Sequence, residues 1–103
     1  MYAYHVTTAG IARKILKHGL LPGIGKRSRQ IEKRPAIHLF KTYDDVENAL
    51  MNWLGEEFGE NIKLALLRVK IPYNAIVVEG AGYEIVVLSR IPAKNIKMVM
   101  RNI

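Results

Sequence analysis

The chain has 103 residues, half of them hydrophobic, which fits one domain over residues 1–103 with a core of its own. It contains no cysteine, so disulfides and thiolate metal sites are excluded, and we expect no metal site. No apolar stretch reaches the ~20 residues of a membrane span, and the N-terminus lacks the apolar run of a signal peptide. We therefore expect a cytoplasmic protein without a membrane partner.

The charge is distributed unevenly along the chain. Sixteen Lys and Arg residues and nine acids give a net charge of +7, yet six of the acids lie between Asp44 and Glu60, where there is no Lys or Arg. One acidic segment in an otherwise basic chain suggests a polyanionic partner such as RNA, DNA or a phosphorylated ligand. A charge that serves only solubility explains the composition equally well.

The first predicted element is a strand from Met1 to Val6, where residues alternate so that His5 and Thr7 lie on one face. Thr7 or Thr8 is a suitable N-cap for the helix that follows, which has an apolar stripe and ends at Gly19. A single histidine on a strand is more often a structural residue than a ligand contact. Both roles are open for His5 on this pattern alone.

Gly23 to Arg34 contains five bases and no apolar period, which predicts a loop. Its Gly23-Ile24-Gly25 neither follows a strand nor opens a helix, so it is not a dinucleotide-binding fingerprint. If the loop closes over a pyrophosphate, the planar guanidinium of Arg27 or Arg29 is suited to bind the phosphate oxygens. The alternative is a solvated basic loop.

A short strand is predicted from Ala36 to Phe40. Thr42 then caps a helix whose apolar residues recur at helical spacing as far as Phe58, and Gly59 ends this helix. Trp53 belongs to the apolar stripe, so we expect it in the core.

The rest of the chain predicts strands. Ile62 to Ile71 is apolar on both faces in its middle, as in a central strand, and further strands are expected at Ala75–Val78 and Lys97–Arg101. Between them, Ile85 to Leu88 is an unbroken aliphatic run that is typical of a strand buried on both faces. Glu84 stands at the start of this run.

A carboxylate at this position costs several kcal/mol if it is dry and unpaired. Glu84 is therefore expected either in a solvated cleft or paired with a base such as Arg68. A third interpretation is that Glu84 only marks the exposed beginning of its strand.

The chain resembles the ADP-ribosyltransferase-like superfamily over nearly its whole length. Tyr4-His5-Val6-Thr7, a short helix and Gly19-Leu20-Leu21-Pro22 are similar to the opening of these domains. Glu84 before a Val-rich strand, followed by Ile91-Pro92, is similar to their C-terminal part. The resemblance implies an α+β fold with a mixed, mostly antiparallel split sheet and two helices.

The same resemblance implies NAD as the substrate. It makes Glu84 the catalytic residue, which stabilises an oxocarbenium-like transition state while the nicotinamide–ribose bond breaks. His5 and Thr7 belong to the strand that binds NAD, with His5 on a ribose hydroxyl. An aromatic ring stacks on nicotinamide, and both Tyr43 and Phe40 are candidates for it.

Three functions are compatible with these observations. The first is an NAD-dependent ADP-ribosyltransferase, such as a small toxin or an RNA-modifying enzyme, with RNA, DNA or a protein as acceptor. The second is an NAD- or nucleotide-binding domain without transfer activity. The third is a basic nucleic-acid-binding module in which His5 and Glu84 are structural. The RNA 2′-phosphotransferase branch of the superfamily, which Ile37-His38-Leu39-Phe40 partly resembles, relies on Arg and His rather than on this Glu.

Overall fold

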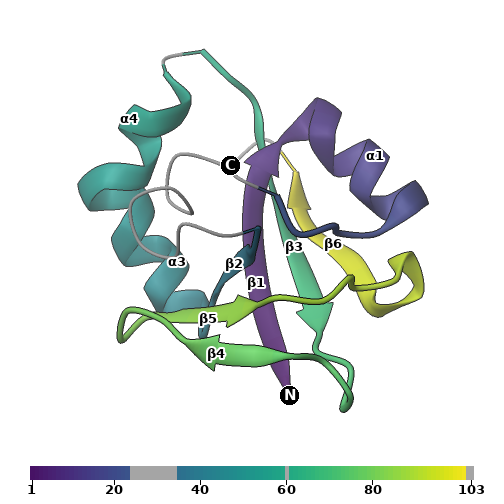
Figure 1. The fold of residues 1–103 in the computed structure, drawn as a ribbon. Coiled ribbons are helices and arrows are strands. Elements are labelled where there is room, and N and C mark those ends of the chain that lie inside the picture. The colour runs from purple at the N-terminus through teal and green to yellow at the C-terminus, as the bar shows by residue number, and fades with distance from the viewer. Residues whose placement is uncertain (24–34, 60, 102–103) are drawn as a thin grey trace.

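A computed structural model describes residues 1–23, 35–59 and 61–101 as an α+β fold. Six strands form one sheet, with α1 against one face and the helices α3 and α4 against the other (Figure 1). The strands are β1 (Tyr2–Thr8), β2 (Ile37–Phe40), β3 (Leu64–Lys70), β4 (Val77–Glu79), β5 (Glu84–Val87) and β6 (Ile96–Arg101). The helices are α1 (Ala9–His18), α3 (Tyr43–Ala49), the π-helix η1 (Leu50–Leu54), α4 (Gly55–Phe58) and the 3₁₀-helix η2 (Ala93–Asn95). No helix within these ranges is long and apolar enough to cross a membrane.

The sheet has the strand order β4-β5-β2-β1-β3-β6. All five neighbouring pairs are antiparallel, which confirms the mostly antiparallel character. The expectation of a mixed sheet with two helices is wrong in two respects, because the described strands include no parallel pair and there are three α-helices, α1, α3 and α4, in the described residues. The strand pairs differ greatly in length. β1 pairs with β3 at seven positions but with β2 only at Tyr4↔Phe40. The pairing between β1 and β2 is therefore the least extensive of the described strand pairs.

The turn from β1 into α1 follows from two residues. Thr8, in an extended conformation, caps the helix, because its Oγ1 accepts a hydrogen bond from the backbone N–H of Ile11 at 3.3 Å. Gly19 ends the helix with a φ of 85°, and a Cβ at this position would lie 2.5 Å from the carbonyl oxygen of Ile91. Glycine thus lets the chain pass close to Ile91, with which Leu20 then forms a β-bridge.

The second helical segment is continuous from α3 through η1 to α4 and ends at Gly59, as predicted. Thr42 caps it, because its Oγ1 accepts from the backbone N–H of Asp45 at 3.1 Å. The sequence pattern did not indicate that Leu50–Leu54 would be π-helical. A π-turn holds more residues than an α-turn and so rotates the side chains that follow, and such turns are frequent at functional sites.

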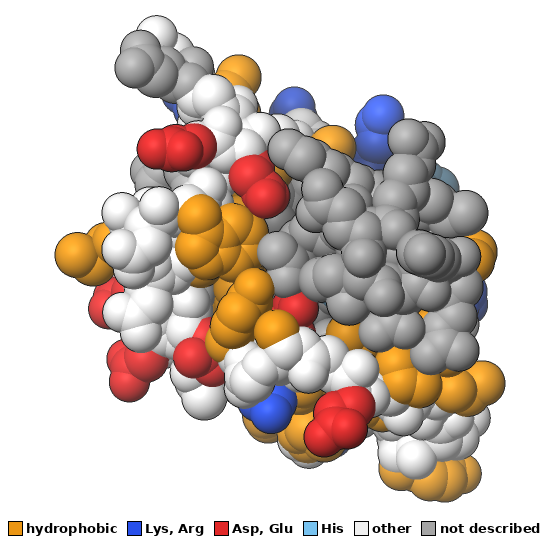
Figure 2. Space-filling view, turned by 60° about the vertical axis from the view of Figure 1, so that its left-hand side comes forward, with side chains coloured by type: hydrophobic (Ala, Val, Ile, Leu, Met, Phe, Trp, Pro, Cys, Tyr) orange, Lys and Arg blue, Asp and Glu red, His pale blue; other side chains and the backbone are white. Residues whose placement is uncertain are grey.

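The core lies on both faces of the sheet. One apolar cluster packs under α1 and includes Ile15, Leu39 and Val87, and the other packs under α3 and η1 and includes Val46 and Leu66. All four residues of β5 are buried, which confirms the burial predicted for Ile85–Val87, whereas Leu88, the last residue of the predicted run, follows the strand and is half-buried. Figure 2 shows the side of α3 and α4, where acidic side chains surround a group of hydrophobic ones.

Candidate functional site

A cavity of about 720 Å³ is lined in part by β1 and β2, which pair with each other only at Tyr4↔Phe40. It is lined by residues of β1, α1, β2, η1, α4 and β5, so segments far apart in the sequence meet there. Most of the lining side chains are apolar. The residues with chemical or recognition potential are His5, Thr7, His38, Phe40, Trp53 and Glu84.

His5 occupies the place where the two strands separate. Continuing the Tyr4↔Phe40 register would set Val6 opposite His38, but no such pair forms. Instead, the His5 ring makes a hydrogen bond to the backbone of His38. Burial lowers the pKa of His5 to about 4, and this hydrogen bond, which favours the protonated form, offsets only part of the effect. The ring is therefore neutral near pH 7, with one N–H donor and one acceptor nitrogen.

Glu84 is held at the rim of β5 by a tight turn. Its backbone N–H donates to the carbonyl of Ala81 at 2.8 Å, and its side chain is buried, with the residue only 5% exposed. A Cβ on Gly80 would lie 2.7 Å from Val86 Cγ2 and 3.3 Å from Glu84 Cβ, so only glycine lets the turn approach this closely. The observed burial contradicts the interpretation of Glu84 as an exposed strand end.

His38 is the ionisable neighbour of Glu84. The register of β2 against β5 sets Phe40 opposite Glu84 and His38 opposite Val86, so the alternation of side chains puts all four on one face. As a result His38 Nδ1 lies 3.4 Å from Glu84 Oε2, an ion-pair distance when the ring is protonated. Arg68, the partner considered from the sequence, does not line this cavity.

Three aromatic rings stand beside the carboxylate. Phe40 is stacked with Tyr83 at a centroid distance of 6.0 Å and an interplanar angle of 24°. Trp53 lies 6.1 Å from Phe40 and 6.0 Å from Tyr83. Phe40 and Trp53 line the cavity, so a flat ligand ring placed near Glu84 would meet an aromatic surface.

The structure brings together four of the residues singled out from the sequence, namely His5, Thr7, Phe40 and Glu84. Tyr43 does not line the cavity. Its ring meets Tyr4 edge-on at 6.4 Å and its hydroxyl donates a hydrogen bond to the sulfur of Met100. Arg27 and Arg29 lie outside the described residues, together with the rest of 24–34.

Sequence reasoning did not include His38 and Trp53 among the site residues, nor Tyr83, whose ring contacts Phe40 and Trp53 next to the cavity. Strand alternation in Ile37–Phe40 already places His38 and Phe40 on one face, and this signal was sufficient to include His38. Trp53 was assigned to the core by its helical spacing, and it does pack there while also lining the cavity. Tyr83 directly precedes Glu84, and no pattern distinguishes it.

The chain matches no protein-family model, no curated protein and no solved structure. In the described part of the chain no group of three or more His, Cys, Asp or Glu side chains is placed to hold a metal ion.

Proposed function

We propose that the cavity binds NAD and that the protein transfers its ADP-ribosyl group to an acceptor. The observation that carries this proposal is that Glu84, a buried carboxylate, shares one cavity with His5, 79 residues earlier in the chain. The volume of about 720 Å³ is within the usual range for small-molecule sites. The short pairing between β1 and β2, with helices on both faces of the sheet, is compatible with the split sheet of an ADP-ribosyltransferase-like fold.

The chemistry proposed for Glu84 follows from its surroundings. When the bond between nicotinamide and ribose breaks, its electron pair leaves with nicotinamide and positive charge develops on the ribose ring. A carboxylate in an apolar cavity stabilises this charge strongly, because little water screens the interaction. His38, 3.4 Å from Glu84, helps to hold the carboxylate in place.

The neighbouring residues are suited to hold the rest of the ligand. The neutral His5 ring uses its N–H toward the backbone of His38, which leaves the other nitrogen to accept a hydrogen bond from a ribose hydroxyl. Phe40 and Trp53 offer aromatic faces for nicotinamide, and of the two rings considered from the sequence Phe40 is the one we propose. The acceptor, whether RNA, DNA or a protein, is not specified by these contacts.

Two measurements on the purified chain test the proposal. NAD should raise the melting temperature in a saturable way, because a ligand that binds only the folded state stabilises it. Nicotinamide should appear when NAD is incubated with the protein and a mixture of RNA, DNA and protein acceptors. Stabilisation without nicotinamide release would instead support an NAD-binding domain without transfer activity. The absence of both would reject the proposal.

A further inference from the structure

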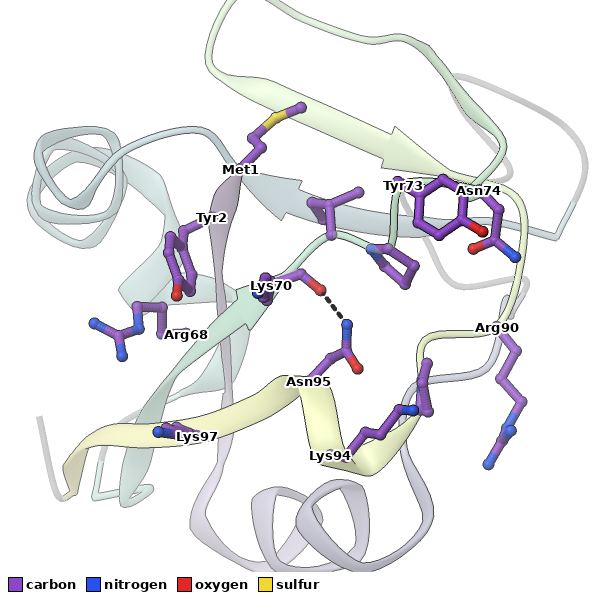
Figure 3. Close-up of a pocket in the computed structure, with 13 residues that line it drawn as sticks. Met1, Tyr2, Arg68, Lys70, Tyr73, Asn74, Arg90, Lys94, Asn95 and Lys97 are labelled. Atoms are coloured by element: carbon purple, nitrogen blue, oxygen red, sulfur yellow. Dashed lines mark hydrogen bonds between the residues drawn. The ribbon is translucent and has the colours of Figure 1, made fainter.

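A second concave surface, a groove of about 880 Å³, shares no residue with the cavity. It lies where β1 begins, β3 ends and the segment before β6 turns (Figure 3). Five of its lining side chains are cationic, and none of the described lining residues is acidic. We define the cationic groove by these five: Arg68, Lys70, Arg90, Lys94 and Lys97.

The strands explain why the cations gather there. Along β3, alternate residues face the side of α3, and the first two, Leu64 and Leu66, are buried beneath the helices. The next two on that face are Arg68 and Lys70, where the helical cover has ended. The same face of the sheet is thus apolar under the helices and cationic beyond them. Sequence reasoning had placed basic character in the loop at Gly23–Arg34 and did not identify this groove.

Folding brings like charges together in the groove. Arg68 and Lys97 lie directly opposite each other on β3 and β6. Such a pair is unfavourable between neighbouring strands, since the two cations repel each other. The presence of this destabilising Arg68–Lys97 pair is explained if a polyanion binds there and neutralises the two charges.

Polar contacts fix the shape of the groove. Asn95 Nδ2 donates a 2.8 Å hydrogen bond to the carbonyl of Lys70, which ties η2 to the end of β3 (Figure 3). Arg90 donates to the carbonyl of His18 at 3.3 Å, so its guanidinium is anchored at the end of α1. These contacts fix η2 against the end of β3 and the Arg90 guanidinium against the end of α1.

Two tyrosines add flat apolar surfaces. The guanidinium carbon of Arg68 lies 4.8 Å from the centre of the Tyr2 ring, a cation–π contact that orients both groups. Tyr73 is fully exposed on the rim of the groove, where burial in the core cannot explain an aromatic residue. Cations that follow a phosphate backbone, combined with rings on which bases stack, are the usual features of a surface for single-stranded nucleic acid.

We propose that the cationic groove binds single-stranded nucleic acid, with phosphates on its Lys and Arg side chains and bases stacked on Tyr73 and Tyr2. This inference does not depend on the NAD proposal, because the two surfaces share no residue. It adds a binding site that a transferase acting on RNA or DNA would use, and it would stand if no NAD chemistry were found.

The test measures binding of fluorescent oligo(dT) and oligo(rU) of about 15 nucleotides at roughly 50 mM salt and above. Lys70→Gln/Lys97→Gln should weaken binding about tenfold or more, and the slope of log K against log salt should become less steep by about 0.7 for each phosphate that the protein no longer neutralises. Arg13→Gln/Lys14→Gln removes the same charge from the exposed face of α1, outside the groove, and should change binding less than about twofold.

Stacking is tested separately with Tyr73→Ala, which is safe for folding because the side chain is fully exposed. It should weaken oligonucleotide binding about fivefold or more and leave the binding of polyphosphate, which has no bases, unchanged. Equal losses in the two double variants would overturn the proposal. Duplex DNA bound as tightly as single strands, or anionic vesicles bound better than oligonucleotides, would overturn it as well. Comparison of dT with rU then shows whether DNA or RNA is preferred.

Discussion

The cavity and the cationic groove use charge in opposite ways. The cavity holds one buried carboxylate, Glu84, among mostly apolar and aromatic side chains, whereas the groove holds five cations, of which Arg68 is half-buried and the other four are exposed. Water and salt screen interactions between exposed charges beyond about 8 Å at physiological ionic strength, and a buried charge is screened much less. A single charge can therefore dominate in the cavity, while in the groove only the sum of many contacts has a large effect.

The largest expected effect is that of Glu84→Gln on turnover. The substitution keeps the size of the side chain but removes the charge that stabilises the transition state. Nicotinamide release should therefore fall by ~10²-fold or more, while the affinity for NAD changes by less than about tenfold. The melting temperature should be unchanged or higher, because a desolvated carboxylate has been removed.

Glu57 provides the matched control for this variant. It also lines the cavity, but its side chain is exposed, so Glu57→Gln should change nicotinamide release by less than about threefold. The groove variant Lys70→Gln/Lys97→Gln should release nicotinamide at the wild-type rate when water is the acceptor. A Glu84→Gln protein that is destabilised yet fully active would show that Glu84 is structural. The cavity would then not differ from the cationic groove in having a single charge that dominates its function.

The next effect concerns the pH dependence of stability. The pKa of His5 is lowered to about 4 in the folded protein, from 6.5 in the unfolded chain, so the unfolded state binds the proton more readily. The stability contributed by neutral His5 is present above about pH 6.5 and is lost as the pH falls toward about 4. Between pH 7 and about pH 4.5, the wild type should lose about 2 kcal/mol more unfolding free energy than His5→Gln.

Urea unfolding at a series of pH values measures this difference. His18→Gln is the control, because His18 is exposed at the end of α1 and lies outside the cavity. It should retain the wild-type pH dependence in this range. If His5→Gln and the wild type lose stability in parallel, the protein surroundings do not keep the His5 ring neutral in the folded state.

A smaller effect is expected for His5→Gln on the use of NAD. A hydrogen bond from a ribose hydroxyl is present both in the bound substrate and in the transition state. Its loss should raise KM for NAD about fivefold and leave kcat within about threefold. Steady-state nicotinamide release over a range of NAD concentrations separates the two constants. A fall in kcat at unchanged KM would assign His5 to the chemical step instead.

Local rules predicted much of the fold and part of the site. The alternation in β1 and the aliphatic run after Glu84 identified the strands and the same-face relation of His5 and Thr7. Gly19 was recognised as the end of the first helix, and the choice of N-cap was narrowed to Thr7 or Thr8, of which the structure shows Thr8. These features depend on short-range geometry and burial. They are therefore visible in a single sequence.

The short pairing between β1 and β2, and with it the cavity, could not be predicted from local rules. It depends on the register between strands that lie about 35 residues apart, and a short strand leaves that register poorly specified by its own pattern. The contact between His38 and Glu84 needs the β2–β5 register in the same way. The cationic groove was missed because nothing in β3 itself marks where the cover of α3 and η1 ends.

The smallest expected effect concerns the repulsion between Arg68 and Lys97 across β3 and β6. Lys97→Gln should raise the unfolding free energy by a few tenths of a kcal/mol, since like charges at opposite positions are destabilising by about that amount. Lys94→Gln removes an equal charge from η2, outside any strand pair, and serves as control. Urea unfolding should show the gain in the wild-type background and not in Arg68→Gln, and about 0.5 M salt should reduce it. A Lys97→Gln protein less stable than the wild type would mean that Lys97 stabilises the fold. The Arg68–Lys97 pair would then no longer support a binding function of the groove.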